Sequence, residues 1–171
     1  MSERRYSAVE LLTADHRVDD FDCGSEAETT WIRSVGLAAQ NSGTSRSYVV
    51  RRLNDDRVVG FHALATGAVL TLDAPRPVAT RVEACPISVI VLTRLGVDIS
   101  EEGQGLGRAL LVDALQRVTA AADIVGVRAL IVHAGNVRSR DFFLALAEFE
   151  PSPTDPLHRF LLINDLRRSL A

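Results

Sequence analysis

The hydrophobic positions of the chain follow two periods, and these predict helices and strands. Apolar residues spaced by three and four predict amphipathic helices over 25–40, 106–122 and 137–147. Ser25 and Glu28 have the spacing of a capping box at the start of the first helix. Shorter apolar runs rich in Val, Ile and Leu predict strands over 6–12, 47–52, 58–69, 87–98, 127–133 and 159–163.

The order of these elements indicates the fold class. Turn residues at 54–56 join two of the strands into a predicted hairpin, and 73–77 and 151–153 read as loops. The order strand, helix, hairpin, long strand, helix, strand, helix, strand predicts an α/β fold with a mixed central sheet flanked by helices. The length of 171 residues fits one domain, so we expect residues 1–171 to form it.

Composition narrows the class of protein. Apolar residues make up 47% of the chain, which excludes a disordered polar tail. No apolar run approaches the roughly 20 residues that span a bilayer, and residues 1–6 do not resemble a signal peptide. We therefore expect a soluble, cytoplasmic protein without membrane contact. Cys23 and Cys85 are expected to be free thiols, and the four histidines show no metal-ligand spacing.

The charge balance limits the possible partners. The formal net charge is −3, which excludes a generic polyanion binder, so any contact with nucleic acid requires a local basic face. All 19 basic residues are arginine. Arginine suits bidentate phosphate contacts, although coding bias alone explains the absence of lysine.

The most informative segment is a glycine loop between the long strand and the second helix. Gly103, Gly105 and Gly107 lack the Cβ atoms that would keep the backbone away from a ligand, and Arg108 adds a positive charge. The helix start adds free N–H groups, so the loop suits a pyrophosphate. A Walker loop is excluded because there is no lysine, and the loop comes too late for a dinucleotide fingerprint. A glycine-rich turn without a ligand has the same pattern.

Two segments resemble the motifs of GNAT acetyltransferases. Residues 102–107 are similar to motif A, with Glu102 in place of the usual Gln or Arg. Asn136 begins a segment similar to the family's second motif, in which Ser139 stands for alanine and Phe143 for tyrosine. The resemblance implies the GNAT fold and acetyl-CoA as the cofactor. The residues it assigns to the cofactor are Leu95, Val97, Gly103, Gln104, Gly105, Gly107, Arg108 and Asn136.

A closer resemblance covers residues 20–166 and concerns the GNAT toxins of bacterial toxin–antitoxin pairs. Its landmarks recur in order at 21–24, 40–46, 60–67, 94–98 and 150–156. It implies acetylation of the α-amine of aminoacyl-tRNA, which blocks translation. It also implies homodimers and a ribbon-helix-helix antitoxin. Candidate tRNA contacts are Arg46 and Arg94, which lie in the landmarks, and Arg138 and Arg140; further candidates are Arg33, Arg51, Arg52 and Arg76.

The expected chemistry is attack of a neutral amine on a thioester. By resemblance, the backbone amide of Val97 polarises the thioester oxygen, and a tyrosine protonates the departing thiolate. Phe143 stands at that tyrosine position and has no hydroxyl. We expect normal binding of acetyl-CoA and slow turnover. Phe143 is either a native residue or an engineered replacement of tyrosine, and the sequence leaves both origins of the phenylalanine open.

Two other functions remain compatible with the sequence. The first is an ordinary GNAT enzyme that acetylates a small amine or a protein N-terminus. An acidic substrate pocket would favour a polyamine or an aminoglycoside. The second is a CoA-binding module that has lost its chemistry at Phe143 and serves an antitoxin complex.

Overall fold

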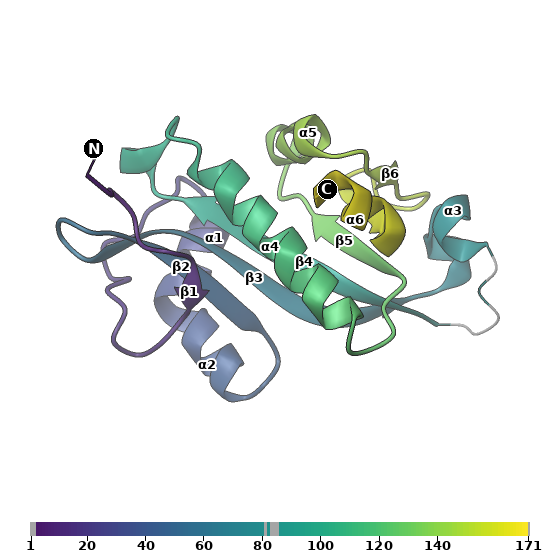
Figure 1. Ribbon diagram of the computed structural model, residues 1–171, viewed down its shortest axis with the longest axis horizontal. Coiled ribbons are helices and arrows are strands. Elements are labelled where there is room, and N and C mark those ends of the chain that lie inside the picture. Colours follow the sequence, from purple (N-terminus) through teal and green to yellow (C-terminus); the bar gives the residue numbers. More distant parts are fainter. Residues whose placement is uncertain (1–2, 81, 83–85, 171) are drawn as a thin grey trace. The chain divides into compact units, whose positions relative to one another are not determined.

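The computed structural model describes residues 3–80, 82 and 86–170. Within them the chain forms two compact units. Unit 1 comprises the described residues up to Leu64 together with Arg94–Asp113. Unit 2 comprises the described residues of Ala65–Thr93 and those from Ala114 onward. Strands β3 (Arg57–Val69) and β4 (Ile87–Val97) and helix α4 (Leu106–Ala122) each contribute to both units (Figure 1).

Unit 1 holds the predicted hairpin and the first helix. Its strands are β1 (Glu10–Leu11), β2 (Arg46–Arg52), the first part of β3 and the end of β4, hydrogen-bonded in that order. β1 with β2, and β2 with β3, pair antiparallel. The helical stretch is α1 (Glu26–Thr30), a π-helical turn η1 (Trp31–Val35) and α2 (Gly36–Asn41). A short 3₁₀ turn, η3 (Ile99–Glu101), follows β4.

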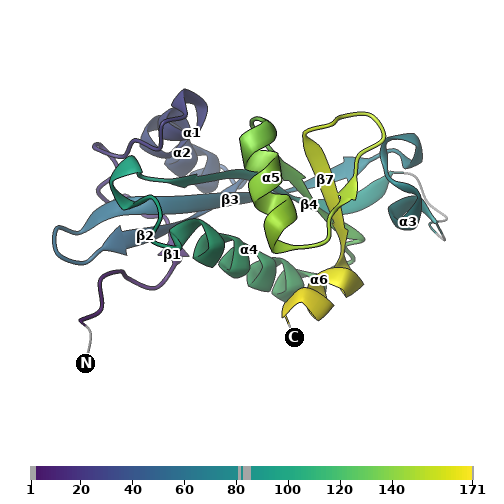
Figure 2. The same ribbon diagram turned by 90° about the horizontal axis from the view of Figure 1, so that it is seen from above.

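Alternation along the strands of unit 1 builds two cores. Val49 and Val58 pack with Ile32 of the π-helical turn. Their neighbours Val50 and Val59 point to the opposite face and pack with the start of α4. Figure 2 shows α1 and α2 on one side of these strands and α4 on the other. The start of α4, which follows the glycine loop, is therefore fixed to the sheet of its own unit.

Gly60 of β3 permits this close packing of α4. A Cβ atom at this position would lie 2.9 Å from the side chains of both Leu110 and Val50. Leu110 and Val59 are fully buried. A larger residue than glycine would push the first turns of α4 away from β3.

Unit 2 contains the parallel part of the sheet. β4 pairs parallel with β5 (Ala129–His133), β5 antiparallel with β7 (His158–Leu162), and β7 antiparallel with β6 (Glu150–Pro151). Its helical elements are η2 (Thr71–Asp73), α3 (Arg76–Ala79), α5 (Val137–Leu146), α6 (Ile163–Leu170) and the second half of α4. The core on one face unites Val78 of α3 with residues of β4, β5 and β7. The predicted mixed sheet is confirmed.

Several predicted elements are confirmed and others need correction. The helix over 106–122, the hairpin and the long strand are present as predicted. The predicted strand 6–12 is wrong over most of its length, because only β1 (Glu10–Leu11) pairs regularly and Tyr6 forms an isolated bridge to Arg52. The loop predicted at 73–77 contains the start of α3.

Local chemistry at the ends of two helices also differs from prediction. The Ser25 side chain does not cap the helix backbone; its hydroxyl donates to the carboxylate of Glu28 instead. Helix α6 is absent from the sequence prediction, although it buries Ile163 and Leu166.

Cys23 is a free thiol, and Cys85 lies outside the described residues. In the part of the chain that is described, no helix has the length and apolar character needed to cross a bilayer.

Candidate active site

The glycine loop of unit 1 takes a conformation that two of its glycines require. Gly103 and Gly105 have φ angles of +77° and +82°, in the left-handed region that residues with a Cβ rarely adopt. No other described atom lies within 4 Å of where a Cβ would stand on either residue. The backbone of the loop is therefore open to a ligand at both positions.

The backbone amides of residues 102–108 make no hydrogen bond to any other described residue. The first amide with a partner is that of Ala109, which donates to the carbonyl of Gly105 at 3.1 Å. Gln104 and Arg108 are exposed in the same stretch. A row of unpaired amides at the start of a long helix, beside an arginine, is an anion-binding arrangement. The residues fit the diphosphate of acetyl-CoA as the sequence predicts.

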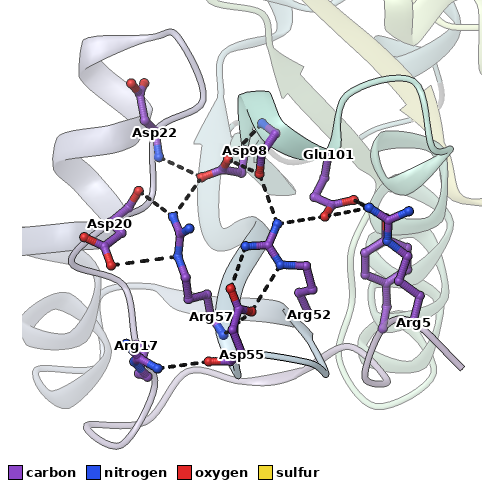
Figure 3. A network of polar contacts seen from close by, with 11 residues as sticks. Arg5, Arg17, Asp20, Asp22, Arg52, Asp55, Arg57, Asp98 and Glu101 are labelled. Atoms are coloured by element: carbon purple, nitrogen blue, oxygen red, sulfur yellow. Dashed lines mark hydrogen bonds and ion pairs between the residues drawn. The ribbon is translucent and has the colours of Figure 1, made fainter.

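Asp98 holds the beginning of this loop. One carboxylate oxygen accepts hydrogen bonds from the amide and hydroxyl of Ser100, at 3.0 and 2.7 Å. The other accepts from the amide of Asp22 at 3.0 Å (Figure 3). Burial alone would raise the pKa of Asp98, but these hydrogen bonds and nearby Arg57 lower it. The buried carboxylate therefore stays ionised and ties the loop to the segment before α1.

The assigned residues of β4 form the wall beneath the loop. Leu95 and Val97 are half-buried and pack against the cluster that contains Leu106 of α4. Val97 is the last residue of β4, and the amide of the following Asp98 donates to the carbonyl of Val59 at 2.8 Å. Leu95, Val97, the glycine loop and Arg108 are thus brought together within unit 1.

Asn136 and Phe143 lie on α5 of unit 2. The Asn136 carboxamide oxygen accepts from the amide of Ser139 at 2.9 Å and caps the helix. Phe143 is 5% exposed and packs edge-on against Phe142 and Phe149, with ring centroids 5.5 and 6.3 Å away. Asn136 therefore has a structural role in starting α5, and Phe143 belongs to an aromatic cluster on that helix.

The predicted tRNA-contacting arginines differ in what they already bind. The Arg94 guanidinium lies 4.7 Å from the Trp31 ring centroid and 3.4 Å from a Glu28 oxygen. Arg46 donates to the carbonyl of Gln40 at 3.0 Å. Arg138 is exposed on α5, and the neighbouring Arg140 reaches Asp141 at 3.3 Å.

Arg51 and Arg52, the further candidates on β2, are engaged in ion pairs inside unit 1. Arg51 contacts Glu10 and Asp56, and Arg52 contacts Asp55 and Glu101. Both guanidinium groups therefore help to hold unit 1 together, and their contact with tRNA stays a prediction.

Unit 2 also contains a pocket of about 520 Å³ that the sequence did not reveal. Its floor is apolar and its rim carries His133, His158, Asp73 and Asp155. The two imidazole rings stack with centroids 3.9 Å apart and planes 12° apart, and His158 lies 3.4 Å from Asp155. Burial and the neighbouring His158 lower the pKa of His133. An amine that enters this pocket meets two carboxylates and a neutral imidazole.

Comparison with known proteins identifies the family. No protein-family model matches the chain. A tRNA-acetylating toxin of Mycobacterium tuberculosis (strain ATCC 25618 / H37Rv) is 44% identical over 162 residues, which covers 95% of each protein. The chain belongs to the GNAT acetyltransferase toxins. The resemblance seen in the motifs is thereby confirmed, and so is the α/β GNAT fold of this toxin.

Solved structures of related toxins agree. The toxin is 25% identical to AtaT in a complex with acetyl-methionyl-tRNAfMet, with a TM-score of 0.86 over 96% of this chain and 99% of the other. It is 26% identical to a tyrosine-to-phenylalanine variant of AtaT bound to acetyl-CoA and to the C-terminus of the antitoxin AtaR. The TM-score of that pair is 0.80 over 96% of this chain and 98% of the other.

Gly105 offers a direct test of the anion site in this toxin. We expect Gly105→Ala to weaken CoA binding about tenfold or more, because a Cβ strains the left-handed backbone and narrows the approach to the amides. Gly43→Ala is the matched control, since Gly43 also has a positive φ of 80° and an equally open Cβ position. Titration calorimetry with CoA measures both variants. Equal CoA affinities in the two variants would contradict the assignment of the loop.

Proposed function

We propose that this toxin transfers the acetyl group of acetyl-CoA to the α-amine of aminoacyl-tRNA and thereby blocks translation. It acts in the cytoplasm, as a homodimer of one domain spanning residues 1–171, and a ribbon-helix-helix antitoxin neutralises it. The observation that carries this proposal is the row of unpaired amides at 102–108 in a chain 44% identical to a tRNA-acetylating toxin. The AtaT structures with acetyl-methionyl-tRNAfMet, acetyl-CoA and antitoxin support the substrate, cofactor and partner.

Separate groups of residues bind the diphosphate and the thioester of acetyl-CoA. When bound, acetyl-CoA supplies an activated acetyl thioester. The amides from Gly103 to Arg108, with Gln104 and Gly107 among them, bind its diphosphate, and the Arg108 side chain adds a positive charge. Leu95 and Val97 line its thioester arm, and the Val97 amide polarises the thioester carbonyl.

An α-amine needs little help to react. The pKa of a free α-amine is about 8, and esterification of the neighbouring carboxyl lowers it, so a usable fraction is neutral at physiological pH. The neutral imidazole of His133 is a suitable proton acceptor at the pocket of unit 2. Phe143 cannot donate a proton to the leaving thiolate. We therefore expect the chain as given to be a slow enzyme.

The phosphates of tRNA require a basic face. We assign this role to Arg46, Arg94, Arg138 and Arg140. Arg46 and Arg138 are exposed, whereas Arg94 and Arg140 are partly buried. The Arg94 guanidinium lies over the Trp31 ring, 4.7 Å from its centroid, and this contact limits the freedom of the side chain before a phosphate binds.

A second candidate substrate is a small polyamine. The observation that favours it is the pair of carboxylates, Asp73 and Asp155, at the rim of the pocket. The His158 ring nitrogen Nε2 lies 3.4 Å from the carboxylate of Asp155. The relationship to tRNA-acetylating toxins favours aminoacyl-tRNA.

One experiment separates these substrates. The protein and its Phe143→Tyr variant are incubated with labelled acetyl-CoA and total aminoacylated tRNA, with uncharged tRNA and spermidine as parallel acceptors. We expect label in the aminoacylated tRNA only, released by mild alkali as an N-acetyl amino acid. If the label appeared in spermidine and not in tRNA, the proposal of aminoacyl-tRNA would be wrong and a polyamine would be the substrate.

A further inference from the structure

A fully buried carboxylate lies at the start of the exposed glycine loop. The side chain of Glu101 is 0% exposed, whereas residues 102–105 directly after it are all exposed. An ionised carboxylate that leaves water without partners is strongly destabilising. Glu101 therefore needs compensation from the surrounding protein.

Three side chains from distant parts of unit 1 supply that compensation. Arg5 donates to both Glu101 oxygens, at 3.0 and 2.9 Å, and Arg52 donates to one of them at 2.9 Å. The Tyr6 hydroxyl also donates to the carboxylate. Figure 3 shows Glu101 between the two guanidinium groups. We call Arg5, Tyr6, Glu101 and Arg52 the loop clamp.

The loop clamp is itself anchored. Asp55 accepts two hydrogen bonds from Arg52, at 3.1 and 2.6 Å, on the side of the guanidinium away from Glu101 (Figure 3). Burial alone would raise the pKa of Glu101, but the hydrogen bonds from Tyr6, Arg52 and Arg5 outweigh it and lower that pKa. Glu101 therefore remains a carboxylate at neutral pH, and its charge is balanced.

The loop needs such a fixed point because its own residues cannot hold it. Gly103 and Gly105 are the residue type that loses most conformational freedom on ordering, and the amides between Glu101 and α4 have no partners among the described residues. The downstream end is fixed by Leu106, which is buried in the core of unit 1. Glu101 is the corresponding point on the upstream side.

Charge balance gives the loop clamp a second effect. An unbalanced carboxylate two residues from Gly103 would repel a diphosphate at the loop amides. Arg5 and Arg52 balance the negative charges of Glu101 and of Asp55, which also pairs with Arg52. The same contacts therefore hold the loop and remove an obstacle to anion binding.

We propose that Glu101 is a positioning residue of the diphosphate site, holding residues 102–106 through the loop clamp in the conformation that binds CoA. The proposal rests on the proposed function, since it takes CoA as the ligand. Glu101 does not touch the reacting atoms; it acts through the loop backbone.

The test compares Glu101→Gln with Glu102→Gln, which removes the same charge from an exposed neighbour in the same loop. We expect CoA to bind Glu101→Gln about tenfold more weakly, the loss typical of a removed charge-assisted hydrogen bond. Glu102→Gln should bind CoA at least as tightly as the starting protein. Pantetheine, which lacks the diphosphate, should bind all three proteins equally. Unchanged CoA affinity in Glu101→Gln, or an equal loss for pantetheine, would overturn the proposal.

A readout without ligand keeps the loop clamp separate from the proposed function. The ¹⁵N order parameters of the Gly103 and Gly105 amides should fall in Glu101→Gln and stay unchanged in Glu102→Gln. Arg5→Gln, a change at a half-exposed side chain, should produce a smaller fall and serves if Glu101→Gln does not fold. Equal order parameters in all variants overturn the loop clamp. Failure of the starting protein to bind CoA, with the fall in order parameters present, overturns the proposed function alone.

Discussion

Phe143→Tyr is expected to raise the rate of acetyl transfer to aminoacyl-tRNA roughly 10²–10⁴-fold, the usual contribution of a positioned general acid. This corresponds to about 3–5 kcal/mol of activation free energy. The physical reason is that the new hydroxyl can protonate the departing thiolate, which Phe143 cannot do. Single-turnover kinetics with labelled acetyl-CoA measure the rate, and CoA binding should stay the same.

Phe142→Tyr is the matched control. Phe142 is the adjacent aromatic residue of α5, and its ring lies edge-on to Phe143 with the centroids 5.5 Å apart. The control adds the same hydroxyl to the same helix on a different face, so it should leave the rate unchanged. Expression of Phe143→Tyr should also arrest growth more strongly than expression of the chain as given. If Phe143→Tyr gained no rate, the proposed role of position 143 would be wrong.

The origin of the phenylalanine bears on this result. Structures of AtaT include a tyrosine-to-phenylalanine variant. In this chain Phe143 packs against Phe142 and Phe149, and this packing does not distinguish a native from an engineered phenylalanine. Both origins lead to the same kinetic expectation.

The double change Arg138→Glu and Arg140→Glu is expected to weaken aminoacyl-tRNA binding roughly 1,000-fold at low salt, because two phosphate attractions of about 1 kcal/mol each become repulsions of the same size. CoA binding should not change, since neither arginine belongs to the glycine loop. Filter binding across a salt series measures the effect. The salt dependence should also become shallower, because fewer counterions are released.

Arg167→Glu with Arg168→Glu provides the control for this experiment. Both residues lie on α6 of the same unit, and both have exposed side chains. The control makes the same change in net charge on another helix, so it should reduce tRNA affinity only slightly. Equal losses in the two double variants would show that net charge, and not the α5 surface, governs binding.

Local sequence patterns determined much of the fold. The helix over 106–122 was predicted correctly because its apolar spacing and the preceding glycine loop are both local signals. The hairpin of β2 and β3 was predicted for the same reason, since turn residues at 54–56 separate two apolar runs. The glycine loop was also found from sequence, because glycine is the residue type that readily adopts a positive φ. Gly103 and Gly105 both have a positive φ in the structure.

The tertiary structure alone decided where the charged residues act. No local pattern pairs Glu101 with Arg5 across 96 positions, or with Arg52, which the sequence offered only as a candidate phosphate contact. Asp98 lies in a recognised landmark, and Ser100 two positions later is the one local signal that could have indicated its capping role. Likewise, the stacked rings of His133 and His158 come from two strands paired in space. Apolar periodicity records which face of an element is buried, whereas the partner of a buried charge depends on which distant segment the fold places beside it.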